Sequence, residues 1–209
     1  RKSPSRGIIN TEATLEEVTT GYFRSGASGL SILTDHTYFG GKEADLIRAR
    51  ELNAIPILRK DFILEEYQII EAKSLGADAI LLIAAVLSAE EVLSLSRTAR
   101  SLDLQILLEV HNREELDRLC DFVDMVGVNN RDLKTFAVDT DISFRLADLI
   151  PEKFIRVSES GISSPGVVKK LREAGYQGFL IGENFMRASD PSLAFSDFVN
   201  NILFDHDQN

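Results

Sequence analysis

The chain has 209 residues, of which 44% are hydrophobic and 27% charged, and its formal net charge is −10. This composition is ordinary for a globular protein with a sizeable core, and the acidic balance disfavours nucleic acid, which binds basic surfaces. The longest apolar run, Ala79 to Leu87, is about half a membrane-spanning helix, and a lone Cys120 offers no disulfide; we therefore expect no membrane partner and a cytoplasmic location.

In chain order, Arg1 to Gly7 has the character of a loop that follows a strand. Seven β-rich apolar runs come next, at Leu30–Thr34, Ile55–Leu58, Ala79–Ala84, Gln105–Val110, Met125–Asn129, Ile155–Ser158 and Gly178–Ile181. Segments with helical periodicity separate or follow them, among them Lys42–Asn53, Glu65–Leu75, Ser88–Ser101, Arg113–Leu119, Ile142–Leu149, Pro165–Ala174 and Ser192–Leu203. Strands that alternate with helices at this spacing predict parallel βαβ units.

The number of strands favours a closed barrel over an open sheet. A doubly wound sheet usually has about five or six strands and a barrel about eight, and seven can be recognised here. The sequence therefore predicts one α/β domain over residues 1–209, a (β/α)8 TIM barrel, with its first strand expected before residue 1.

Reactive side chains stand where several of these strands end, which is where such barrels carry their active sites. Lys60, Glu109, Asn129 and Glu159 end four different strands, so we expect them to converge on one mouth. A lysine that faces two carboxylates can divide acid and base roles. Charged residues also end strands simply because the chain surfaces there. Arg59 and Lys60 are adjacent, so only one can face the mouth, and the other is expected to form an outer ion pair.

Two glycine turns predict a phosphate site. Ser160 and Gly161 follow the seventh strand of the expected barrel, and Gly182 and Glu183 follow the eighth, where these barrels commonly bind phosphate beside a short extra helix. By contrast, His36, His111 and His206 lack the spacing of metal ligands, and no metal is expected.

A series of motifs resembles the indole-3-glycerol phosphate synthase family of tryptophan biosynthesis. They are Arg1-Lys-Ser-Pro-Ser5, Ser31-Ile-Leu-Thr34, Pro56-Ile-Leu-Arg-Lys-Asp-Phe62, Gly76-Ala-Asp-Ala-Ile-Leu-Leu82, Leu108-Glu-Val110, Gly127-Val-Asn-Asn-Arg-Asp-Leu133, Ser158-Glu-Ser-Gly-Ile162 and Phe179-Leu-Ile-Gly182. They span the whole chain in the family's order, and the Lys-Asp-Phe, Asn-x-Arg-Asp-Leu and Ser-Pro-Ser motifs in series are specific.

The resemblance implies a carboxy-lyase that closes, decarboxylates and dehydrates 1-(2-carboxyphenylamino)-1-deoxyribulose 5-phosphate, without cofactor or metal. It implies that Lys60 protonates the ketone oxygen, Glu109 is acid and base in the dehydration, and Asn129 holds Glu109 and the substrate. The other implied substrate contacts are Ser3, Ser31, Phe62, Leu81, Arg131, Glu159 and Ser160, and the implied phosphate contacts are Gly161, Gly182 and Glu183. Phe62 and Leu81 would line the aromatic ring.

The sequence departs from the family in two places. The family's first-strand Glu and Lys would precede Arg1, so the alternative is an inactive or merely phosphate-binding barrel fragment. Glu183 stands where many members have Ser, and we expect its backbone N–H to face the phosphate with the side chain turned away. A rival barrel, the isomerase one step earlier in the pathway, relies on a Cys and Asp pair, and Cys120 does not end a strand. Association with other enzymes of the pathway is left open.

Overall fold

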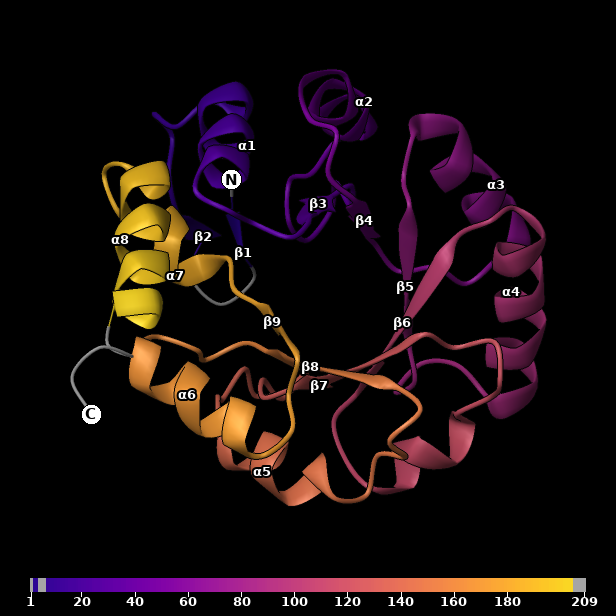
Figure 1. The fold of residues 1–209 in the computed structure, drawn as a ribbon. Coiled ribbons are helices and arrows are strands. Elements are labelled where there is room, and N and C mark those ends of the chain that lie inside the picture. Colours follow the sequence, from indigo (N-terminus) through magenta and orange to yellow (C-terminus); the bar gives the residue numbers. More distant parts are fainter. Residues whose placement is uncertain (1, 4–6, 205–209) are drawn as a thin grey trace.

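The structure, a computed structural model, describes residues 2–3 and 7–204. Its centre is a parallel sheet of seven strands in which each strand pairs with the next along the chain. The strands are β3 (Leu30–Leu33), β4 (Ile57–Lys60), β5 (Ala79–Ile83), β6 (Gln105–Val110), β7 (Met125–Asn129), β8 (Ile155–Glu159) and β9 (Gly178–Leu180). The sheet curves so that the helices surround it on the outside (Figure 1). The architecture is that of a TIM barrel, as predicted.

The helical layer contains both the expected helices and one that the sequence analysis did not single out. Its members are α1 (Leu15–Arg24), α2 (Glu43–Leu52), α3 (Glu66–Leu75), α4 (Ala89–Ser101), the 3-10 helix η1 (Glu114–Arg118), α5 (Asp141–Ala147), α6 (Pro165–Glu173), α7 (Glu183–Met186) and α8 (Pro191–Phe204). The unforeseen helix is α1, although Thr14 and Glu17 form a capping box at its start. No helix in the described part of the chain is long and apolar enough to cross a membrane.

Besides shifts of one or two residues at the ends of other elements, two features differ from the predictions made from the sequence. The strand expected at Ile55–Leu58 runs two residues later, over Ile57–Lys60, and starts after Pro56, which has no N–H to give to a sheet. The opening segment, expected to be a loop, contains a short antiparallel pair, β1 (Lys2–Ser3) and β2 (Gly7–Ile8).

Strands β5 to β7 are buried on both faces over most of their length, which explains why β5 is apolar throughout. Side chains that alternate along a strand enter two different layers. The outer layer, between strands and helices, holds the large core, for example Ile57, Ile80 and Leu108. The inner layer is smaller and is built around Leu81, Ile83, Leu107 and Val157.

Helices α1 and α8 meet in the helical layer. Helix α1 packs against both α8 and α2, so the helices form a continuous ring at this point (Figure 1). Ser192 at the start of α8 donates a hydrogen bond to the carbonyl of Glu17 at 2.9 Å, and a Cβ at Gly21 would collide with Ser192. The strand layer has no such closure among the described residues, because β3 and β9 form its two ends and do not pair with each other.

Candidate active site

Lys60 lies between two buried carboxylates at the carboxyl end of the sheet. Its Nζ is 3.2 Å from Oε2 of Glu109 and 3.3 Å from Oε2 of Glu159. Both glutamates are nearly inaccessible, whereas the Lys60 side chain keeps 22% of its surface exposed. The three residues come from β4, β6 and β8, and their expected convergence is confirmed.

Asn129 ends β7 and fixes the second oxygen of Glu109. Its Nδ2 donates to Glu109 Oε1 at 3.0 Å, and its Oδ1 accepts from the backbone N–H of Arg131 at 3.0 Å. The amide therefore cannot turn without losing a bond on either side. Asn129 joins Lys60, Glu109 and Glu159 in a single cluster, as the sequence predicts.

The two carboxylates of this cluster have opposite electrostatic environments. Burial would raise the pKa of Glu109, but the charge of Lys60, the nearby imidazole of His111 and the hydrogen bond from Asn129 outweigh it and hold the pKa below its usual range. For Glu159, burial raises the pKa, and Lys60 offsets this only in part because the charge of Glu109 acts against it. Neighbouring carboxylates that differ in this way can take different proton-transfer roles.

Two residues of the cluster, His111 and Glu115, were missed at the sequence level. His111 follows β6 directly, and its Nε2 is 3.3 Å from Glu109 Oε1. Glu115 in η1 lies 3.2 Å from the other ring nitrogen, Nδ1. Alternation along a strand was the available signal, because His111 stands two residues after Glu109 and faces the same side.

Aromatic and apolar side chains border the site on the β4 and β5 side. The ring of Phe62 lies 5.9 Å from that of Tyr38 and 6.5 Å from that of Phe39. Leu81 is buried in the inner layer, against which Phe62 also packs. Ser31 on β3 is exposed, while the side chain of Ser3 lies outside the described residues.

The two turns that were predicted to bind phosphate lie at the ends of β8 and β9, and phosphate binding there stays a prediction. Ser160 and Gly161 both have positive φ, 64° and 73°, an uncommon conformation for serine that other contacts must hold in place. One such contact is the hydrogen bond from Asn130 Nδ2 to the Ser160 carbonyl, 3.1 Å. A Cβ at Gly161 would collide with Val138. Gly182 precedes the short helix α7, as expected.

Arg131 and Glu183 link these turns to the loop that follows β7. The Arg131 guanidinium donates to Glu183 Oε2 at 2.8 Å. This ion pair was not foreseen, and it offsets the negative charge of Glu183 next to the predicted phosphate site. Whether the side chain turns away from a bound phosphate stays a prediction.

The buried polar residues behind the Ser160 turn form a closed hydrogen-bond network. Asn130 Oδ1 accepts from Ser143 Oγ at 2.8 Å, Ser143 and Ser158 share a bond of 2.8 Å, and the Tyr176 hydroxyl donates to the Ser143 carbonyl at 2.7 Å. The network connects β7, β8 and α5, and through Asn130 it holds the Ser160 turn in place.

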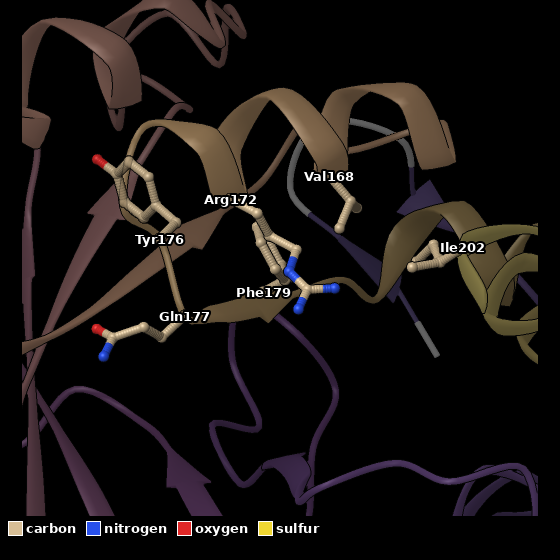
Figure 2. A pocket seen from close by; sticks show the side chains of 6 residues that line it. All are labelled: Val168, Arg172, Tyr176, Gln177, Phe179 and Ile202. Atoms are coloured by element: carbon tan, nitrogen blue, oxygen red, sulfur yellow. The ribbon is translucent and has the colours of Figure 1, made fainter. Parts of the chain in front are cut away.

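A pocket of about 380 Å³ lies elsewhere, between α6, β9 and α8 (Figure 2). Its lining residues are Val168, Arg172, Tyr176, Gln177, Phe179 and Ile202. None of them belongs to the predicted site. Cys120 is also remote from the mouth, since it precedes β7 and packs against the outer core.

Comparison with known proteins gives a consistent result. A family model described as indole-3-glycerol phosphate synthase matches residues 1–198. A protein named indole-3-glycerol phosphate synthase from Bacteroides thetaiotaomicron is 51% identical over 97% of this chain and 78% of its own length. Proteins of the same name from a Polaromonas species and from Carboxydothermus hydrogenoformans are each 44% identical, over 94% and 93% of this chain and 75% and 74% of their own lengths.

Among solved structures, a mandelate oxidase variant aligns with a TM-score of 0.70 at 17% identity, over 91% of this chain and 69% of that chain. A second mandelate oxidase structure aligns with the same TM-score at 16% identity, over 91% of this chain and 68% of that chain. At this level of identity the likeness concerns the barrel fold alone.

Proposed function

The chain belongs to the indole-3-glycerol phosphate synthase family of tryptophan biosynthesis, and on that basis we propose that the Lys60 cluster converts 1-(2-carboxyphenylamino)-1-deoxyribulose 5-phosphate into indole-3-glycerol phosphate, carbon dioxide and water. A cytoplasmic location is part of the proposal and rests on the lone cysteine. The observation that supports the proposed reaction is the position of the Lys60 ammonium between the carboxylates of Glu109 and Glu159.

Lys60 supplies the proton for ring closure. When the ring carbon that bears the carboxylate attacks the ketone carbon, negative charge develops on the ketone oxygen, and Lys60 protonates it. The two carboxylates raise the pKa of Lys60 despite the cost of burial, so Lys60 carries its proton before the substrate binds. Loss of carbon dioxide leaves its electron pair to the ring and restores aromaticity.

Glu109 then serves the dehydration. It takes a proton from the closed-ring intermediate and gives a proton to the new hydroxyl, which leaves as water, and its depressed pKa keeps it ionised for the first of these transfers. Asn129 holds the carboxylate in register through Oε1. Each well-placed proton-transfer group typically contributes about 10² to 10⁴ in rate.

The remaining residues bind the substrate. We assign the aromatic ring to the apolar side formed by Phe62 and Leu81, polar contacts to Ser3, Ser31, Arg131 and Glu159, and the phosphate to the turns at Ser160, Gly161, Gly182 and Glu183. The positive φ of Ser160 supports this assignment, because strained non-glycine residues cluster at ligand sites.

The test is a fluorescence time course for the indole product with wild-type protein and Lys60→Met. Lys153→Met is the matched control, because Lys153 forms an exposed pair with Asp121 outside the cluster. We expect Lys60→Met to lower kcat by about 10² to 10⁴ and Lys153→Met to behave as wild type. A substrate analogue whose ketone is reduced to an alcohol cannot cyclise, and its Kd should change only a few-fold in Lys60→Met. Wild-type turnover by Lys60→Met would overturn the role of Lys60.

A further inference from the structure

His111 belongs to the cluster around Lys60 but has no role in the proposed reaction, although its side chain is largely buried between charged groups. Its side chain is 12% exposed, and it lies between two carboxylates, Glu109 on the Nε2 side and Glu115 on the Nδ1 side. Nε2 is buried and has no hydrogen-bond partner of good geometry among the described residues, although Glu109 Oε1 is only 3.3 Å away. A buried polar atom in this state calls for an explanation.

Glu115 fixes the orientation of the imidazole. Glu115 Oε2 accepts from the backbone N–H of His111 at 2.7 Å and lies 3.2 Å from Nδ1. Its Oε1 accepts from Asn112 Nδ2 at 2.9 Å, and its own N–H donates to Asn112 Oδ1 at 3.0 Å. Glu115 is therefore a rigid anchor, and the ring it holds can only present Nε2 to Glu109.

The two oxygens of Glu109 consequently face different partners. Oε1 faces Asn129 Nδ2 and His111 Nε2, which are both donors when the imidazole is charged. Oε2 faces Lys60. We propose that His111 is a positioning residue for the reaction: anchored by Glu115, its imidazolium blocks Oε1, so that the proton that Glu109 takes from the substrate and returns is carried on Oε2 alone. This inference rests on the proposed acid and base role of Glu109.

The charges around His111 agree with this geometry. Burial alone would lower the pKa of His111, but Glu109 and Glu115 outweigh it and raise the pKa to about 9. Behind Glu109 stand Lys60 and Glu159, which share its cluster, and Asn112 beside Glu115 is neutral. The imidazole thus keeps its proton at neutral pH and offers no free lone pair to Glu109.

The pairing can be tested without turnover by NMR titration of the imidazole nitrogens. The described residues include His36 and His111, and His206 completes the set of three, so His111→Gln assigns the signal. We expect His111 to titrate well above the ordinary value in the wild-type protein. Glu109→Gln and Glu115→Gln should each lower that pKa by about one unit or more, because each removes a facing charge.

The role in the reaction is tested by the pH profile of kcat. We expect His111→Gln to lower kcat about tenfold with little change in KM, because His111 contacts Glu109 and not the substrate. The wild-type profile should fall above about pH 9 as His111 loses its proton, and this alkaline limb should be absent from His111→Gln. Glu115→Gln, which leaves the ring in place, should show the limb at lower pH. His36→Gln, an exposed residue, is the matched control and should leave the profile unchanged.

The outcomes are separable. An absence of wild-type turnover would count against the proposed function, and the NMR titration would still decide the pairing of His111 with Glu109. The inference is overturned if His111 titrates at an ordinary pKa that Glu109→Gln does not change, or if a folded His111→Gln keeps the wild-type kcat and alkaline limb.

Discussion

Arg59 and Lys60 are neighbours on β4, yet they organise two buried polar clusters of different character on opposite faces of the sheet. The outer cluster lies between strands and helices, where Arg59 donates to Thr34, to the Gln68 carbonyl and to Asp61, and also pairs with Glu71 at 2.8 Å. The inner cluster surrounds Lys60 at the mouth. The expectation that one residue faces the mouth and the other forms an outer ion pair is confirmed.

The difference between the clusters lies in how completely their polar atoms are satisfied. Arg59 has a partner at each guanidinium nitrogen. In the inner cluster, Oε1 of Glu159 and Nε2 of His111 are buried without hydrogen-bond partners among the described residues. A satisfied network rigidifies a fold, whereas unsatisfied polar groups with shifted pKa values are typical of functional sites.

The largest expected effect on stability comes from the outer cluster. Arg59→Met leaves the partly buried carboxylates of Asp61 and Glu71 without their counter-charge and should lower the free energy of unfolding by about 3–5 kcal/mol. Lys60→Met should lower it less, because Glu159 already has a raised pKa and can take up a proton. Urea titrations followed by circular dichroism measure both variants. If both substitutions lowered the free energy of unfolding equally, the proposed difference between the two clusters would be wrong.

A smaller effect is expected from the inner side of β7. Gly127 lies under Glu159, and a Cβ there would collide with Glu159 Oε1 and approach Leu107 to 3.2 Å. Gly127→Ala should therefore displace the carboxylate from Lys60, cost about 1–3 kcal/mol of stability and reduce kcat/KM about tenfold. Gly166→Ala on α6, where an added Cβ meets only a distant side-chain atom, is the control. A fully active Gly127→Ala would show that the position of Glu159 is not critical.

The smallest effect is the dependence of stability on pH. Because the folded-state pKa of Glu159 is raised, the folded protein holds this proton to a higher pH than the unfolded chain does. The contribution of Glu159 is therefore most favourable below about pH 4.5 and is lost as pH rises toward 7. Glu159→Gln should remove this loss. Thermal melts between pH 4.5 and 7.5 measure it, and parallel curves for both proteins would contradict the prediction.

Strand alternation explains what could be predicted from the sequence. It separated Lys60 from Arg59, whereas the ends of the apolar runs identified Lys60, Glu109, Asn129 and Glu159, and the rule that parallel barrels carry their active sites at the carboxyl ends of the strands predicted that they meet. The apolar runs of β5 and β6 were long enough to be recognised on their own.

The remaining features depend on contacts that only the folded chain forms. Glu115 has no neighbour in the sequence that marks it as a partner of the site, and only the fold of η1 brings it to His111. The pairing of Arg131 with Glu183 joins residues 52 positions apart. Helix α1 was missed although the capping box of Thr14 and Glu17 was a local signal for its start; only its packing against α8 could not be predicted from a local pattern.

The junction of α1 with α8 has a consequence for the order in which the molecule assembles. Asn10 donates to the carbonyls of Met186 and Ala188, and Ser192 to that of Glu17, so these contacts join residues 175 to 178 positions apart. Closing so long a loop costs more chain entropy than the βαβ units, which close over a few tens of residues. We therefore expect the contacts between α1 and α8 to form late in folding and to be lost first in local unfolding. The backbone amides near Gly182 should then exchange with solvent sooner than those of β5 to β8.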